Sequence, residues 1–191
     1  MLSCTHNLNY LSMKRALLVP CVIAIMSLGF RSPEPPPAED FCTRLKTMLE
    51  AAKDGFSPVK GEATTRMITG HEKKYYKATV TFVDGHECYI NDVSSYPECE
   101  CLLETDTRIT EKLSNSYESY KKQIQECLGH EWVIVEKDST NDYYLKGTKY
   151  KKLAVRENIT GKKEKFHLYI YSSMIEKKRV VELKFEGLGK K

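Results

Sequence analysis

The sequence of 191 residues lacks most of the patterns that identify an enzyme. Its ten Gly are scattered, so it has no glycine-rich phosphate loop, and no G-x-S-x-G nucleophile motif occurs. His71, His86 and His130 are each followed by Glu, but none has the second His, four residues on, that a zinc-protease helix requires. We therefore expect no cofactor, no metal site and no catalytic residues, and the sequence leans away from an enzyme without excluding one.

A hydrophobic run long enough to cross a bilayer is also lacking. The apolar stretch 16–26 has eleven residues, whereas a membrane-spanning helix needs about twenty. Lys14 and Arg15 precede this stretch and small residues follow it, an arrangement typical of a secretory signal. We expect residues 1–29 to be a signal peptide and the mature protein to be secreted or periplasmic, without a membrane span.

Two features of this leader leave alternatives. Residues 1–12 are polar, so Met13 is the expected true start and the preceding dozen residues a mis-assigned extension. An uncleaved leader would anchor the protein in a membrane, and Cys21 would allow a lipid anchor, although Pro20 before it disfavours lipoprotein processing. A cleaved signal fits the pattern better than either anchor.

Removal of the leader changes the composition of the chain. Without residues 1–29 it keeps 28 Lys and Arg, 26 Asp and Glu, and five of its seven Cys. The net charge falls from +4 to +2, which is too small for a nucleic-acid binder, so nucleic acid is not an expected partner. Four Pro within residues 30–38 predict a stiff linker. A single domain is expected over residues 39–187, followed by a tail over 188–191.

Hydrophobic periodicity predicts an α+β fold. Apolar residues recur at helical spacing over 39–54 and 107–128, and strand-like segments follow each helix, in the order helix, three strands, helix, four to five strands. The connections are short, so we expect the two helices to pack on a mainly antiparallel sheet. In outline this order resembles secretion-chaperone-like and cystatin-like domains, but the chain carries the signature residues of neither. The expected strands are 73–82, 88–90, 98–104, 132–136, 143–146, 153–157, 165–171 and 179–185.

The turn at Asp84-Gly85 sets the register of the first two predicted strands. A three-residue loop over 83–85 pairs Val80 with Cys88 and keeps the apolar residues of both strands on one face, whereas a two-residue loop would separate them. The three-residue loop is therefore the prediction.

The five Cys of the mature chain predict disulfide bonds, because an exported protein meets an oxidising compartment. Cys99 and Cys101 lie two apart on one strand and point the same way, so each is expected to bond elsewhere. Cys88 is the expected partner of one, and Cys127 of the other. The odd residue, Cys42, is expected to stay free, buried, or paired between chains.

Charge is unevenly distributed along the mature chain. Residues 30–140 hold 14 basic and 20 acidic residues, for a net charge of −6, whereas residues 141–191 hold 14 and 6, for +8. Aromatic residues interleave with Lys in the basic segment, a composition that suits an anionic or amphipathic partner. If Phe166, Leu168 and Ile170 face the core, the alternate residues line the outer face. The predicted ligand-binding residues are Tyr143, Tyr144, Lys162, Lys163, Lys165, His167, Tyr169 and Tyr171.

These observations favour a secreted or periplasmic non-enzymatic binding domain whose basic sheet contacts an acidic protein or polyanion. The alternative is a small-molecule binder or hydrolase with a pocket between the second helix and the sheet, lined by Tyr117, Tyr120 and Trp132. Self-association of acidic and basic halves is a third possibility, and the basic face is also open to a purely solubilising role. Glu98 and Glu100 share one strand face, where we expect hydrated carboxylates.

Overall fold

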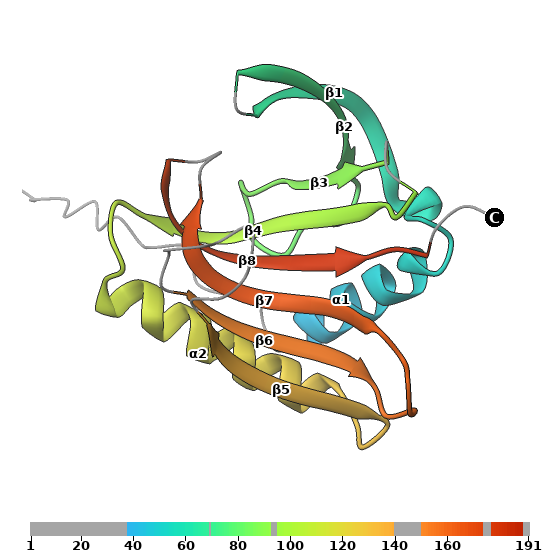
Figure 1. Cartoon of the computed structure of the whole chain (residues 1–191), viewed down its shortest axis with the longest axis vertical. Coiled ribbons are helices and arrows are strands. Elements are labelled where there is room, and N and C mark those ends of the chain that lie inside the picture. The colour runs from blue at the N-terminus through green and yellow to red at the C-terminus, as the bar shows by residue number, and fades with distance from the viewer. Residues whose placement is uncertain (1–37, 69, 93–94, 140–149, 174–176, 189–191) are drawn as a thin grey trace, which may run out of the picture. The chain divides into compact units, whose positions relative to one another are not determined.

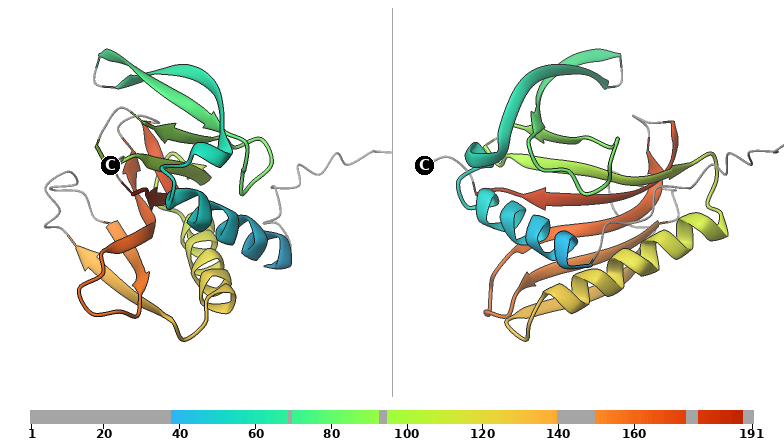
Figure 2. Two further views of the ribbon diagram at one scale, coloured as in Figure 1. Left: turned by 90° about the vertical axis from the view of Figure 1, so that its right-hand side faces the viewer. Right: turned by 180° about the vertical axis from the view of Figure 1, so that it is seen from behind.

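A computed structural model describes residues 38–68, 70–92, 95–139, 150–173 and 177–188, and within them two α-helices lie on one face of a single antiparallel sheet (Figure 1, Figure 2). The predicted leader, most of the linker and the last residues of the tail lie outside the described residues. The elements are α1 (Ala38–Ala52), the 3-10 turn η1 (Ser57–Val59), β1 (Lys60–Ile68), β2 (His71–Ala78), β3 (Cys88–Asn91), β4 (Glu98–Asp106), α2 (Glu111–Cys127), β5 (Trp132–Ser139), β6 (Tyr150–Glu157), β7 (Glu164–Ser173) and β8 (Lys178–Glu186).

The sheet has eight strands in the order β1-β2-β3-β4-β8-β7-β6-β5, and every neighbouring pair is antiparallel. Each half of the chain is therefore one helix followed by a four-stranded meander, and the two meanders join where β4 pairs with β8. The α+β class and the two helices are confirmed. The predicted order of three strands before the second helix is wrong, because β1 precedes them; its sequence, KGEATTRMI, has no alternating apolar set. The predicted strand 143–146 lies outside the described residues.

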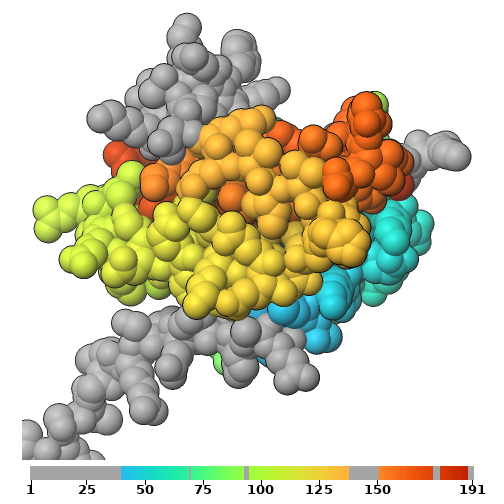
Figure 3. All heavy atoms as spheres, turned by 90° about the horizontal axis from the view of Figure 1, so that it is seen from below, coloured from blue at the N-terminus to red at the C-terminus, as the bar shows by residue number. Residues whose placement is uncertain are grey.

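The hydrophobic core fills the space between the helices and the sheet. Phe41 and Met48 of α1 and Leu113 and Ile124 of α2 are fully buried against the inner face of the sheet. In the space-filling view of Figure 3, α2 lies along β5 and α1 adjoins it. Since only one face of each strand enters this core, the other face of the sheet has to be stabilised by different contacts.

The connection after β2 differs from the predicted tight turn. β2 ends at Ala78, and residues 79–87 form a longer loop before β3. Phe82 of this loop enters the core, with its ring centroid 5.4 Å from that of Phe41. The strands still present their apolar residues to one face, because Tyr76 pairs with Ile90. The predicted pairing of Val80 with Cys88 is wrong, because Val80 lies in this loop, and burial of Phe82 in the core helps to explain why the strand does not continue.

Two disulfides connect the described cysteines. Cys88 and Cys101 are directly opposite on β3 and β4 and are bonded, as one of the predicted options has it. The second bond joins Cys42 of α1 to Cys127 at the end of α2, so the prediction of a free Cys42 and a strand partner for Cys127 is wrong. The helices share one face of the sheet, and this neighbourhood brings the two residues together. The free thiol is Cys99, which is buried in the core.

Loss of the helix–helix disulfide is expected to destabilise the protein more than loss of the strand–strand one. The bonds close loops with sequence separations of 85 and 13 residues. Loop-closure entropy then assigns them about 4–5 and about 3 kcal/mol respectively. In urea unfolding, we expect C42A/C127A to lose more free energy of unfolding than C88A/C101A. C99A serves as a control that removes a thiol but no bond. Equal losses in the two double variants, or the reverse order, would contradict this.

Candidate functional site

The sheet curls toward the face that the helices leave uncovered. In the strand order, β1 and β4 are three strand spacings apart, which is about 14 Å in a flat sheet. The side chains of Arg66 on β1 and Glu100 on β4 meet across these strands, with Nη1 of Arg66 3.3 Å from Oε2 of Glu100. Figure 1 shows the β1–β2 hairpin arching at the top of the sheet. The curl makes this face concave, and we call it the open face.

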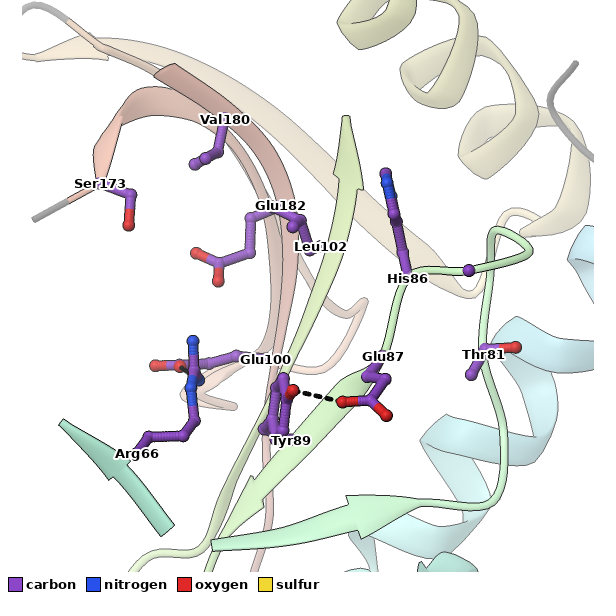
Figure 4. Close-up of a pocket in the computed structure, with 11 residues that line it drawn as sticks. Arg66, Thr81, His86, Glu87, Tyr89, Glu100, Leu102, Ser173, Val180 and Glu182 are labelled. Carbon is purple, nitrogen blue, oxygen red and sulfur yellow. Dashed lines mark hydrogen bonds and ion pairs between the residues drawn. The ribbon is translucent and has the colours of Figure 1, made fainter. Parts of the chain in front are cut away.

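A pocket of about 390 Å³ lies on the open face, between the hairpin and the centre of the sheet (Figure 4). We call it the curled-face pocket. Its walls come from β1, β3, β4, β7, β8 and the loop over residues 79–87. The lining residues are Arg66, Thr81, Gly85, His86, Glu87, Tyr89, Glu100, Leu102, Ser173, Val180 and Glu182.

Strand alternation explains which side chains line this pocket. On β4, Cys99, Cys101 and Leu103 enter the core, so Glu100 and Leu102 face the other way. The same rule on β8 sends Val181, Leu183 and Phe185 to the core and leaves Val180, Glu182, Lys184 and Glu186 on the open face. The prediction that the three β4 residues share one face is therefore correct. The expectation that Glu98 and Glu100 are freely hydrated is not met, because both contact Lys184.

Arg66 is held by aromatic rings as well as by Glu100. Its guanidinium carbon lies 4.3 Å from the ring centroid of Tyr89 and 5.3 Å from that of Tyr75. Such cation–π contacts are strongest where water is excluded, and Tyr75 is buried. The hairpin is thereby fixed over the sheet, and the positive charge of Arg66 is already matched by one carboxylate.

Glu87 at the rim of the pocket is also matched by a cation. Its Oε1 accepts a hydrogen bond of 2.5 Å from Nζ of Lys77, and its Oε2 accepts one from the hydroxyl of Tyr89. Hydrogen bonds from Lys77 and Tyr89 lower the pKa of Glu87, so it is ionised at neutral pH.

Glu182 has a different environment from the other two carboxyl groups of the pocket. Among the described residues its polar partner is Tyr171, whose hydroxyl donates a 2.5 Å hydrogen bond to Oε2. Lys184, the next open-face residue on β8, pairs instead with Glu98 at 2.9 Å. Burial, and the negative charge of Glu100, raise the pKa of Glu182 to about 8. The Glu182 carboxyl is therefore mostly protonated at pH 7.

The predicted residues of β7 divide into two groups. Phe166, Leu168 and Ile170 face the core, so His167, Tyr169 and Tyr171 lie on the open face, as the alternation predicted. Only Tyr171 reaches the surroundings of the curled-face pocket, through Glu182. Tyr169 lies at the ring edge of Tyr171, with centroids 5.9 Å apart. Tyr143 and Tyr144 lie outside the described residues.

His167 is enclosed rather than presented to solvent, with a relative exposure of 3%. Its Nε2 lies 2.6 Å from Oε2 of Glu164, which also accepts a hydrogen bond from Lys152. Burial lowers the pKa of His167 to about 4, assisted by Lys152 and Lys184 and opposed by Glu164. At neutral pH His167 is thus an uncharged hydrogen-bond donor to Glu164. Through Glu164 it is connected to Lys152 of β6.

Of the predicted lysines, Lys162 and Lys163 lie in the turn between β6 and β7, and Lys165 is the second residue of β7. Lys162 and Lys165 both approach Glu157, at 4.0 and 3.7 Å. Lys163 differs, because its Nζ lies 5.2 Å from the ring centroid of Tyr96, which is 63% exposed. The structure thus places these lysines away from the curled-face pocket.

The residues proposed for a pocket beneath the second helix are placed differently from that expectation. Tyr117 and Tyr120 are buried in the core against the sheet. Trp132 instead lines a second pocket of about 280 Å³, between α1, the end of α2 and the margin of the sheet.

Two residues of the curled-face pocket, Arg66 and Glu182, were not predicted from the sequence. The alternation of Glu and Lys on β8 was a signal that this strand has a polar face.

The described part of the chain contains no group of three His, Cys, Asp or Glu placed to hold a metal ion. It also contains no helix that is long and apolar enough to cross a membrane.

Replacement of Glu182 by Gln is expected to stabilise the protein at neutral and mildly alkaline pH. The folded-state pKa of about 8 exceeds the ordinary value of 4.5, so the folded state binds an extra proton between these values and wild-type stability falls as pH rises. Gln imitates the protonated carboxyl. The thermal midpoint of E182Q should therefore gain several degrees on wild type between pH 5 and pH 8, whereas E72Q, at an exposed position, should not. A constant difference across this range would refute the assignment.

Comparison with known proteins identifies no relative of this chain. No protein-family model, no curated protein and no solved structure matches it.

Proposed function

We propose that this protein is a non-enzymatic binding protein that takes a small organic molecule into the curled-face pocket. The observation that carries the proposal is a pocket of about 390 Å³ whose walls come from five strands and a loop. This volume lies within the range of about 300–1,000 Å³ that is usual for small-molecule sites. The two disulfides are compatible with an extracellular protein, and secretion is part of the proposal.

The composition of the pocket supports ligand binding. Leu102 and Val180 supply apolar wall, while Glu182, Ser173 and His86 supply polar groups. Ligand sites typically combine apolar surface with a few convergent polar groups in this way. The rigid framework around the pocket, in which Tyr89 and Arg66 fix the hairpin, also lowers the entropic cost of binding.

The pair of carboxyl groups favours binding over hydrolysis. Hydrolases can use two neighbouring carboxyl groups, and Glu100 and Glu182 lie on adjacent strands. However, both oxygens of Glu100 are engaged by cations, Oε2 by Arg66 at 3.3 Å and Oε1 by Lys184 at 3.9 Å, so neither is free to act on a substrate. The protonated carboxyl of Glu182 can donate a hydrogen bond to a ligand or accept one from it. The other two carboxylates that line the pocket, Glu87 and Glu100, each have a cationic partner.

Filling the pocket should abolish ligand binding. Leu102→Trp replaces a leucine of the pocket wall with a bulky indole that occupies the pocket. Ile159→Trp introduces the same indole at an exposed turn and serves as a matched control. A library of small, water-soluble organic molecules would be screened by saturation-transfer NMR. We expect hits whose affinity falls at least tenfold in L102W and is unchanged in I159W. The proposal is rejected if no compound binds, or if the hits bind L102W as tightly as wild type.

A second candidate function is contact with an acidic protein or another polyanion at the β6–β7 turn. The specific observation that favours it is the juxtaposition of exposed Lys163 with exposed Tyr96, next to Lys162. Tyr and Lys together supply the apolar surface and the charge that such interfaces use. Glu157 offsets part of this charge, because it lies within ion-pair distance of Lys162 and Lys165.

Charge reversal at this turn provides the test. Retention on heparin should fall to a lower salt concentration in K162E/K163E/K165E than in K46E/K122E/K178E, which makes the same change in net charge at dispersed exposed positions. If the two triple variants elute together, the turn is not a polyanion site and only the net charge matters.

A further inference from the structure

We propose that the ligand of the curled-face pocket is a small organic monoamine, bound as its ammonium ion by the carboxylate of Glu182. This inference rests on the proposed small-molecule function and names the chemical class of its ligand. Figure 4 shows the Glu182 carboxyl projecting into the space between Ser173 and Arg66.

One carboxyl group of the pocket, that of Glu182, has no cation in ion-pair contact among the described residues, although the charges of Lys184 and Arg66 act on it from a greater distance. Arg66 is paired with Glu100, and Lys77 is paired with Glu87. Both pairs are between side chains of the described protein, so they need no ligand. Glu182 has the Tyr171 hydroxyl as its hydrogen-bond donor and forms no ion pair among the described residues. A ligand cation would supply the partner that the fold gives to the other two carboxyl groups.

A carboxyl group in this position is unfavourable for stability alone. Burying an ionised carboxylate without a cation is costly, and a protonated carboxyl would be replaced by an apolar or amide side chain without loss. Hydrogen bonding to Tyr171 lowers the cost of ionisation but supplies no positive charge. Glu182 is therefore better explained by a bound cation than by the packing of the open face.

The shape of the site favours an organic cation over a metal ion. Ca²⁺ takes six to eight oxygen ligands, whereas the described residues provide no cluster of three suitable groups. The pocket is also much larger than one ion, and beside Glu182 its wall is formed by Val180 and Leu102. Val180 is 1% exposed although it lies outside the helix-side core, so the open face has an apolar surface of its own. An ammonium group on an apolar body matches both features.

Binding of an ammonium ion at this position has a stoichiometric proton balance. In the free protein at pH 7, Glu182 holds a proton; on binding, the carboxyl O–H bond breaks, the proton passes to the buffer, and the ligand keeps its own proton. Close to one proton is thus released for each ligand bound. The charged and titratable groups near Glu182, on every element that borders the pocket, are Arg66, His86, Glu87, Tyr89, Glu100, Tyr171 and Lys184.

The coupling of amine binding to proton release determines how the affinity for an amine changes with pH. Below the pKa of about 8, each unit of pH raises the ionised fraction of Glu182 up to tenfold. Affinity for an amine should therefore rise up to tenfold from pH 6 to pH 7 and level off above pH 8.

The experiment uses three primary amines, phenethylamine, cyclohexylamine and butylamine, each beside its neutral alcohol, 2-phenylethanol, cyclohexanol and butanol. Titration calorimetry at pH 7 in phosphate and in HEPES, neither of which carries a primary amine, separates the binding heat from the heat of proton release. We expect at least one amine to bind at least tenfold more tightly than its alcohol and to release close to one proton. E182Q should lose both properties, while E98Q keeps them; Glu98 is on the same strand face as Glu100 but outside the pocket.

The outcomes separate this inference from the proposed function. If none of the three amines binds more tightly than its alcohol, or if E182Q binds the amines as tightly as wild type, the amine inference is overturned. Neutral or anionic compounds that bind wild type but not L102W would then leave the small-molecule function intact. If the pocket binds neither amines nor any library compound, both proposals fail together.

Discussion

The antiparallel pairing of β4 with β8 is the contact on which the rest of the structure depends. It joins two meanders that are otherwise separate in sequence, and it places both helices over the same face of one sheet. The disulfide between Cys42 and Cys127 follows from that arrangement, because the helices become neighbours. The pocket follows as well, since the same pairing brings Glu100 and Glu182 onto adjacent strands with their side chains on the open face.

Local patterns in the sequence predicted the two helices, most of the strands and the faces of β4 and β7, because these depend on spacing within one segment. Three features depend on distant partners and were beyond such patterns. β1 has no alternating apolar residues, and it is held by pairing with β2 and by the Arg66 contacts across the curl. The partner of Cys42 depends on helix packing. The role of Glu182 depends on the register between β8 and β4, which no residue of β8 reveals by itself.

Some of the opposed charges of the two halves of the sequence meet within one molecule. Lys184 of the basic segment pairs with Glu98, and Lys151 of the same segment approaches Glu118 of α2. The Lys151–Glu118 pair is exposed, and exposed pairs contribute little to stability, about 0–1 kcal/mol each. Their effect is on the surface potential, which is more mixed than the linear sequence suggests. Glu182 differs from the paired carboxyl groups because it forms no ion pair among the described residues.

The buried thiol of Cys99 affects how fast the disulfides can rearrange. Its sulfur lies 4.0 Å from that of Cys101, close enough to exchange partners with the Cys88–Cys101 bond. The attacking species in such exchange is the thiolate, and burial raises the pKa of Cys99 well above its ordinary range. In the folded protein the thiolate is therefore scarce and the native pairing is kinetically protected. Competition between Cys99 and Cys101 for Cys88 is confined to the period before the sheet has closed over all three sulfurs.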